Sequence, residues 1–190
     1  MEEKNIVEEV RRFVEEECNK PSANYPLAYK FHFVQMHKIA KELAERLKAD
    51  VEVVEVAAWL HDIGSILFGR ANHHVTGAEI AEKKLRELNY SEEKISLVKK
   101  CILNHRGSQE LTNKRDFLEA KIIAEADVLE AFSNIGKQFL ATLVYENKSL
   151  EDSIESIKKK LRNKWNQLEL EESKELIKPK YDAAMLLLSD

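Results

Sequence analysis

The chain has 190 residues and a formal net charge of −4, from 30 basic and 34 acidic side chains. This length fits a single globular domain with a substantial apolar core. With only 5 Gly and 3 Pro, the sequence lacks the turn residues that many short strands require, so we predict a mostly helical fold. The negative charge argues against broad binding of nucleic-acid backbones, and no apolar stretch approaches the roughly 18 residues of a membrane span.

The amino-terminus and the cysteines predict the cellular location of the protein and the redox state of its thiols. The acidic start Met1-Glu2-Glu3 is unlike a signal peptide, so we predict a cytoplasmic protein. Cys18 and Cys101 are too few for a disulfide framework or a zinc cage of their own, and we expect reduced thiols. No internal repeat or linker composition occurs, which predicts one domain over residues 1–190.

Apolar residues at helical spacing predict a succession of helices along the whole chain. Asp50 and Ser91 are the expected N-caps of two of them. Gly64 stands where a helix is expected to stop, and residues 65–72 are interpreted as a connection, loosest at Gly69. The segments 51–63 and 117–132 are apolar on most of their circumference and should lie at the centre of the fold. The first expected helix begins at Val7 and ends near Pro21. The other expected helices span about residues 33–47, 51–63, 74–88, 92–105, 117–132, 139–145, 150–165 and 181–190.

Ionisable residues interrupt three of these apolar stripes. His32 shares a stripe with Met36 and Leu43, and is therefore expected to face the interior. His61 and Asp62 end the most apolar helix, so at least one of them should point inward. Asp127 lies in the stripe of the segment 117–132. An unpaired carboxylate buried in such a place is costly.

Three explanations for these polar residues are mutual pairing, buried water, and a divalent cation bound by all of them. Taken alone, His32 is more often a core histidine bonded to a backbone carbonyl, and Asp127 the partner of a lysine such as Lys121. Taken together, the residues favour a cation. His61 and Asp62 project about 100° apart, so both reach one ion only from a helix end or a distorted last turn.

Three segments resemble the blocks of the HD superfamily of metal-dependent phosphohydrolases: His32–Met36, Ala57–Gly64 and Ala126–Ala131. The resemblance runs from about residue 32 to 132, roughly half of the chain. It implies an all-α helical bundle of the HD-domain type, with a motif-bearing core at about 27–135 completed by carboxy-terminal helices at 136–190. It also implies that the metal ligands are His32, His61, Asp62 and Asp127.

Two further segments resemble subgroups of the superfamily that hold a second metal or hydrolyse nucleotide phosphates. The segment His73–Ala78 is similar to a His-containing turn before a helix, and Asn104-His105-Arg106 to the histidine that ends the following helix. The resemblance implies that His73 and His105 are candidates for second-metal ligands and join Asp62 as catalytic residues. Ser65-Ile66 stands where many members carry Lys or Glu, and Glu130 replaces a common aspartate, so the substrate class stays open.

The leading hypothesis is hydrolysis of a phosphate ester or phosphoanhydride in a small nucleotide. A divalent ion lowers the pKa of its bound water from about 15.7 toward 7. Asp62 is the candidate to orient or deprotonate that water. Arg70, Arg106 and Lys121 are the candidate phosphate-binding residues, although a surface charge is an equally good interpretation of either arginine.

The imidazole and carboxylate ligands favour manganese or iron, with cobalt, nickel, zinc or magnesium as the other candidates. One alternative function is a non-catalytic nucleotide-sensing or adaptor HD module, and a lower-ranked one is a di-iron oxygenase on the same fold. The basic run 158–164 suggests nucleic-acid binding, but a solvated helix face explains it better. The expected partner is a small phosphorylated molecule, and no association with a membrane is expected. The leaving group, the number of metal ions and the oligomeric state stay open.

Overall fold

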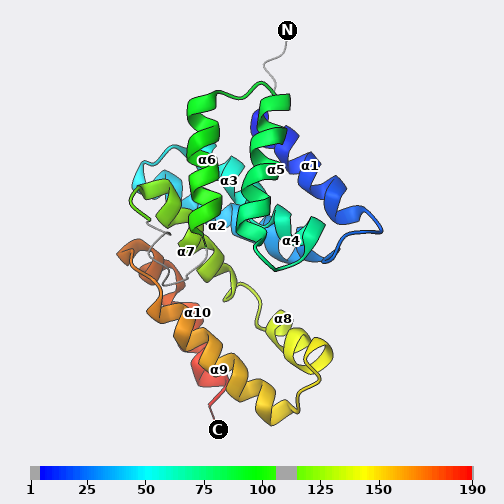
Figure 1. Cartoon of the computed structure of the whole chain (residues 1–190). Coiled ribbons are helices and arrows are strands. Elements are labelled where there is room, and N and C mark those ends of the chain that lie inside the picture. The colour runs from blue at the N-terminus through cyan, green and yellow to red at the C-terminus, as the bar shows by residue number, and fades with distance from the viewer. Residues whose placement is uncertain (1–4, 106–114, 190) are drawn as a thin grey trace. The chain divides into compact units, whose positions relative to one another are not determined.

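The computed structural model describes residues 5–105 and 115–189, and these are helical with no strand among them (Figure 1). The predicted all-α fold is confirmed. Within the same residues, no helix is long and apolar enough to cross a membrane. Two compact units divide the chain, residues 1–126 and residues 127–190, whereas the single domain of 1–190 stays a prediction.

The first unit is built around α3 (Val51–Leu60), which packs against α1 (Ile6–Asn19), α2 (Val34–Leu47) and α6 (Glu92–Asn104). All residues of α3 from Val56 to Leu60 are buried. Asp50 accepts a hydrogen bond from the backbone N–H of Val53, and Ser91 caps α6 in the same way, as predicted. The side-chain caps begin these helices, and burial of their apolar faces holds them in place.

A π-helical turn, η1 (Tyr29–Phe33), precedes α2 and continues into it without a break. A π turn inserts an extra residue into a helical ladder and occurs often at functional sites. It leaves Phe33 fully buried and the neighbouring His32 half-buried. The helix expected at about 33–47 therefore starts one turn earlier, and that added turn carries His32.

The interpretation of Gly64 as a helix stop is wrong. Gly64 lies inside α4 (Ile63–Phe68), in part of the chain predicted to be a connection. A Cβ atom at this position would lie 2.2 Å from the backbone oxygen of His73, the first residue of α5 (His73–Glu87). The glycine therefore permits close packing of α4 on α5. The turn falls at Gly69, whose φ of 83° suits glycine, as expected.

The boundary between the units falls within α7 (Leu118–Glu130), and the second unit continues with α8 (Ile135–Phe139), the π-helical η2 (Leu140–Tyr145), α9 (Leu150–Asn166) and α10 (Glu171–Leu187). Ile157 and Leu161 form the buried face of α9. The prediction that the last helix starts at Tyr181 is wrong, because α10 begins at Glu171 and contains Pro179. Tyr181 stacks on Trp165 with ring centroids 4.6 Å apart, which joins α10 to α9.

Candidate metal centre

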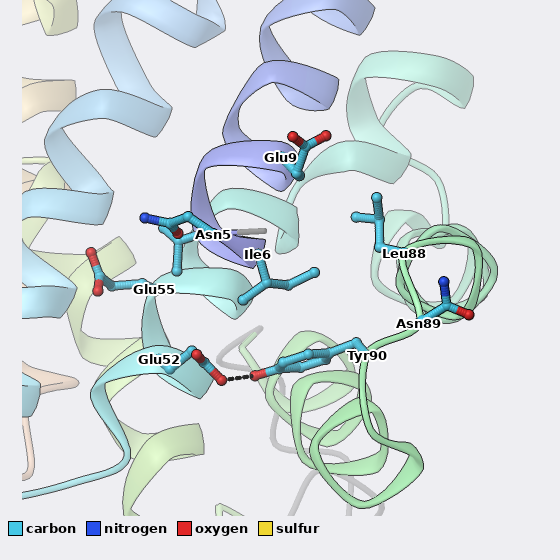
Figure 2. A pocket seen from close by; sticks show the side chains of 9 residues that line it. Asn5, Ile6, Glu9, Glu52, Glu55, Leu88, Asn89 and Tyr90 are labelled. Carbon is cyan, nitrogen blue, oxygen red and sulfur yellow. Dashed lines mark hydrogen bonds between the residues drawn. The ribbon is translucent and has the colours of Figure 1, made fainter. Parts of the chain in front are cut away.

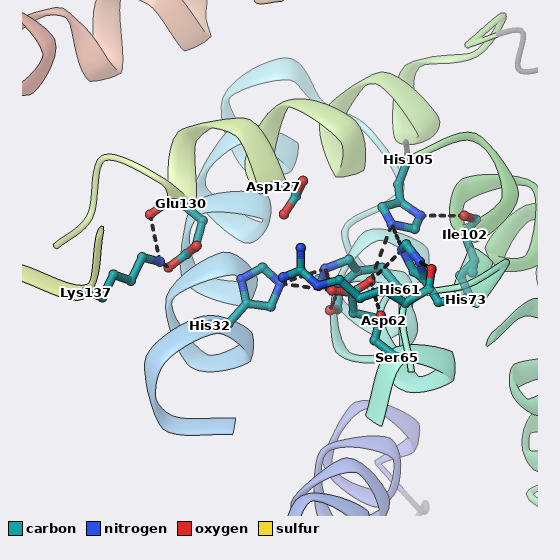
Figure 3. A network of polar contacts seen from close by, with 12 residues as sticks. His32, His61, Asp62, Ser65, His73, Ile102, His105, Asp127, Glu130 and Lys137 are labelled. Carbon is teal, nitrogen blue, oxygen red and sulfur yellow. Dashed lines mark hydrogen bonds and ion pairs between the residues drawn. The ribbon is translucent and has the colours of Figure 1, made fainter. Parts of the chain in front are cut away.

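Five polar side chains of the first unit converge where several helices begin or end (Figure 3). His61 is fully buried, His73 and His105 are 8% and 5% exposed, and His32 and Asp62 are half-buried. The contributing positions are His32 in η1, His61 at the end of α3, Asp62 at the start of α4, His73 at the start of α5 and His105 at the end of α6. The change of direction at the junction of α3 and α4 lets both His61 and Asp62 face this cluster.

The two oxygens of Asp62 face two different pairs of imidazoles. Oδ1 lies 3.0 Å from Nε2 of His73 and 3.6 Å from Nε2 of His105. Oδ2 lies 3.7 Å from Nε2 of His32 and 4.0 Å from Nε2 of His61. Within each pair the Nε2 atoms are close, at 3.3 Å for His73 and His105 and 2.9 Å for His32 and His61. One carboxylate thus stands between two sets of nitrogen ligands.

Backbone carbonyls fix the orientation of three of these imidazoles. In each case the acceptor lies three residues earlier in the chain, at a distance of 2.6–2.9 Å from Nδ1. With Nδ1–H donating, a neutral ring presents the lone pair of Nε2 to the cluster, and this arrangement is the usual support for a metal-binding histidine. The pairs are His61 with Ala58, His73 with Arg70, and His105 with Ile102.

The electrostatics of the cluster keep Asp62 ionised. Burial alone would raise the pKa of this carboxyl, but when these rings are protonated a hydrogen bond from His105, the positive charge of His61 and a hydrogen bond from His73 together hold it well below its usual value. Ser65 Oγ lies 3.4 Å from Oδ1 of Asp62, at the long end of a hydrogen bond. The site therefore offers an anionic oxygen ligand at neutral pH.

The donor set fits a divalent transition metal. Asp62, His73 and His105 each provide one donor atom, and these atoms lie within 4.8 Å of one another. Neutral imidazole with carboxylate suits manganese, iron, cobalt, nickel or zinc better than magnesium, which prefers oxygen ligands alone.

Asp127 is the first residue of the second unit and lies on α7. Its side chain is 28% exposed, and Oδ2 lies 3.4 Å from Nζ of Lys164 on α9. The lysine that pairs with Asp127 is therefore Lys164 and not Lys121, which the sequence had suggested as an alternative. Ligation of a metal by Asp127 stays a prediction.

The structure describes two of the three candidate phosphate-binding residues, and these two differ in exposure. Arg70 is exposed, with its guanidinium carbon 5.6 Å from the centre of the Tyr25 ring. Lys121 is half-buried on α7. Arg106 lies outside the described residues. A role in phosphate binding stays a prediction for all three.

Sequence reasoning assigned no role to Ser65, although it lies 4% exposed beside Asp62. The spacing of three residues on one helix was the available signal, because such residues face the same side. Because Gly64 is interpreted from sequence as the end of a helix, helical periodicity is not applied to Ser65, and the direction of its side chain cannot be predicted. Ser65 is placed to orient Asp62.

A cavity of about 600 Å³ lies elsewhere in the first unit (Figure 2). Its three acidic residues already have partners within the chain. Glu52 accepts hydrogen bonds from Tyr90 and Lys94, Glu55 contacts His37 and Lys41, and Glu9 lies 3.7 Å from Arg12. None of the histidine cluster lines it. The lining residues are Asn5, Ile6, Val7, Glu9, Glu52, Glu55, Leu88, Asn89 and Tyr90.

Comparison with known proteins identifies the family. Residues 29–131, more than half of the chain, match the HD domain. The chain belongs to the HD-domain family. This confirms the resemblance drawn from the three sequence blocks, and the matched range contains His32, His61, Asp62 and Asp127.

The chain is similar to known proteins that differ in length. It is 31% identical over 136 residues to a tRNA (cytidine(56)-2'-O)-methyltransferase of Picrophilus torridus, a match that covers 67% of this chain but only 39% of that relative. Its fold is similar to an HD-superfamily hydrolase from Bacillus thuringiensis, with a TM-score of 0.73, 21% identity, and coverage of 95% and 91% of the two chains. Bacillus subtilis YpgQ, solved in complex with ADP, gives a TM-score of 0.71 at 20% identity, covering 95% and 92%. The two structures share the fold of this chain.

Proposed function

We propose that this HD-domain protein is a metal-dependent phosphohydrolase that cleaves a phosphate ester or phosphoanhydride of a small nucleotide. The observation that carries the proposal is the position of the Asp62 carboxylate between the His32–His61 pair and the His73–His105 pair. Two cations held on either side of one carboxylate form a recurrent site for phosphoryl chemistry. Manganese or iron suits these ligands best.

Each ligand has a proposed place in this centre. His32, His61 and Asp127 would hold one ion, and His73 and His105 the other, with Asp62 shared between them. Asp127 enters through its place in the third HD sequence block, which lies inside the matched range. The backbone carbonyls that accept from His61, His73 and His105 would keep these rings in the ligating tautomer.

The cations, when bound, supply a water of lowered pKa and polarise the phosphoryl oxygen. Asp62 would hold and orient that water by accepting a hydrogen bond from it. Because its pKa is strongly lowered, the Asp62 carboxyl stays ionised and does not retain a proton. Ser65 would restrain the Asp62 carboxylate. Arg70, Arg106 and Lys121 are the proposed counterions for the charge that develops on the transferring phosphoryl group.

A nucleotide substrate is supported by the similarity of fold to YpgQ, which was solved with ADP. The proposed products are a nucleotide or nucleoside and either phosphate or pyrophosphate. A cytoplasmic location fits such a substrate.

The test measures bound metal and product release in the same preparations. We expect the manganese-loaded chain to release phosphate or pyrophosphate from at least one member of a nucleotide panel that includes ADP. Asp62→Asn should lower that rate about 1000-fold or more, because it removes a charged group at the reacting centre. Asp182→Asn is the control, since Asp182 is exposed and paired with Lys178 on α10. Bound metal without release from any nucleotide would contradict the proposal.

A non-catalytic nucleotide-binding module is the second candidate. It is favoured by the match to a longer tRNA methyltransferase, of which the aligned segment covers only 39%. This alternative predicts saturable nucleotide binding, unchanged nucleotide after long incubation, and retention of metal. A di-iron oxygenase ranks below both and would show oxygen-dependent turnover of the iron-loaded chain.

A further inference from the structure

The π turn η1 of the first unit contacts α3 at both of its ends. At its first residue, the ring of Tyr29 stacks on Trp59, with centroids 5.9 Å apart and planes inclined by 19°. At its last residue, the buried ring of Phe33 meets His61 edge-on, with centroids 5.6 Å apart. His32 lies between these two contacts, directly before Phe33. The position of the His32 ring therefore depends on how the turn sits on α3.

The geometry of η1 makes these contacts important. The π-helical ladder joins residues five apart, is rare in proteins, and occurs mostly as a single turn within an α-helix. η1 is such a turn, since α2 follows it directly. Because this ladder is rarely adopted, we expect contacts with other elements to hold it in place.

Trp59 is the surface on which the start of the turn rests. It lies on α3 two residues before His61 and is 3% exposed. Its indole nitrogen has no hydrogen-bond partner within residues 5–105 and 115–189. A buried tryptophan usually finds such a partner, so this ring contributes through its aromatic faces and not through its N–H group.

A hydrogen bond from α1 holds the Tyr29 ring in this position. Nη1 of Arg11 donates to the hydroxyl oxygen of Tyr29 at 2.6 Å. The guanidinium is itself fixed by Glu8 and Glu15 of the same helix, at 2.8 Å and 2.6 Å. Tyr29 is thus joined to α1 by its hydroxyl and to α3 by its ring.

We propose that Tyr29 is a positioning residue for the metal centre, and that its stacked and hydrogen-bonded ring sets the 2.9 Å approach of Nε2 of His32 to Nε2 of His61. The inference rests on the proposed function, in which these two histidines hold one ion, and deepens it by naming the group that sets their spacing. Loss of a residue that orients metal ligands typically weakens metal binding by about 10–100-fold.

The first test observes the imidazoles directly, by nitrogen-15 NMR of the full-length, metal-free chain at neutral pH. In Tyr29→Leu we expect the Nε2 resonances of His32 and His61 to shift, while those of His73 and His105 stay in place. A general loosening of the fold would move both pairs. A selective shift therefore distinguishes positioning from a loss of stability.

His37→Gln is the matched control for the lost stack. His37 also stacks on Trp59, with centroids 4.6 Å apart, but it lies on α2, outside the π turn. This variant should leave the resonances of His32 and His61 in place. Equal shifts in Tyr29→Leu and His37→Gln, or an unmoved His32 resonance in folded Tyr29→Leu, would overturn the inference.

Two milder variants decide the question if Tyr29→Leu does not fold. Tyr29→Phe and Arg11→Gln break the same hydrogen bond from its two sides and keep an aromatic ring on Trp59. They should therefore give the same, smaller shift of the His32 resonance. Arg12→Gln is their control, because Arg12 pairs with Glu8 and Glu9. A His32 resonance that moves no more in these two variants than in Arg12→Gln would overturn the inference.

Metal binding and hydrolysis separate this inference from the proposed function. We expect Tyr29→Leu to weaken Mn²⁺ binding about tenfold or more, and His37→Gln to change it less than about twofold. Unchanged Mn²⁺ affinity in Tyr29→Leu would overturn the inference and leave the proposed function intact. Selective shifts of His32 and His61 without hydrolysis of any nucleotide would support the positioning role and contradict the phosphohydrolase.

Discussion

The Nε2 atoms of His32 and His61 lie 2.9 Å apart. Nδ1 of His61 bonds to the carbonyl of Ala58, so in a neutral ring Nε2 of His61 is an acceptor and Nε2 of His32 carries the bridging proton. A cation at this position would replace that proton and take the lone pairs of both rings. Protons and metal therefore compete for the same pair of nitrogens.

This competition predicts the pH dependence of metal binding. As the pH falls, protons compete more strongly for the imidazole nitrogens of the cluster, so the affinity for Mn²⁺ should fall. Metal at 100 times its dissociation constant should stabilise the neutral-pH fold by about 2.7 kcal/mol. Thermal unfolding at several pH values measures both effects.

Two variants control this measurement. His61→Gln should abolish the stabilisation by Mn²⁺, because it removes a fully buried side chain that is a proposed ligand. His37→Gln should keep it, because His37 contacts Glu55 rather than the cluster. Equal stabilisation of both variants would contradict the assignment of His61 as a ligand.

Gly64→Ala should disturb the metal centre through the packing of α4 on α5. The new Cβ would meet the backbone oxygen of His73 at 2.2 Å, so the start of α5 must move. We expect a cost of about 1–3 kcal/mol in the free energy of unfolding, together with weaker metal binding, since His73 is a proposed ligand.

Gly136→Ala in α8 is the matched control for Gly64→Ala. Its Cβ would meet only the side-chain oxygen of Asn134, at 3.1 Å, and alanine is favoured over glycine within a helix by about 1 kcal/mol. Urea unfolding and metal titration of the two variants give the comparison. If Gly64→Ala unfolds and binds metal like the wild type, the close approach of α4 and α5 is not required.

His37 should make the fold sensitive to mild acid. Its ring stacks on Trp59 with centroids 4.6 Å apart, and burial lowers its pKa despite the opposing effect of Glu55. Because the unfolded chain binds this proton first, the contribution of neutral His37 is complete above about pH 6.5 and is lost as the pH falls toward the lowered folded pKa.

Urea unfolding of the metal-free chain at pH 7.5 and 5.5 tests this role of His37. The wild type should lose more stability over this interval than His37→Gln. Parallel losses in the two proteins would show that His37 is not responsible. Metal-free samples are needed because the other histidines also respond to bound metal.

The two cysteines should be unreactive in the folded protein. Burial raises the pKa of Cys18 to about 11, and burial raises that of Cys101 still further. Since the thiolate is the reactive form, a disulfide reagent at pH 8 should label neither residue until guanidinium unfolds the chain, when both react. Rapid labelling without denaturant would contradict the described burial of these side chains.

The fold was predictable where local signals agreed. Asp50 and Ser91 cap helices that follow them, and the apolar circumference of the segment 51–63 correctly placed α3 at the centre. Gly64 misled the prediction, because a glycine needed for tertiary contact resembles a helix stop. The sequence around Gly64 does not reveal what packs against it.

The candidate site was predictable in its membership but not in its geometry. The HD motif selected His61 and Asp62, and similarity selected His73 and His105, all of which the structure brings together. That each oxygen of Asp62 faces a separate imidazole pair depends on how the helix ends meet, which no periodicity encodes. The arginines were chosen by position in loops, where sequence carries little information about where a side chain points.

The most direct measurement is the number and coupling of Mn²⁺ ions bound per chain, by elemental analysis and electron paramagnetic resonance. We predict about two ions per chain with a spin-coupled signal, as expected for ions about 3.5–4 Å apart that share the Asp62 carboxylate. Asp62→Ala should lose the coupling and most of the bound metal, while Asp182→Ala should match the wild type. Wild-type protein that binds no manganese, or coupling that survives in Asp62→Ala, would contradict the account.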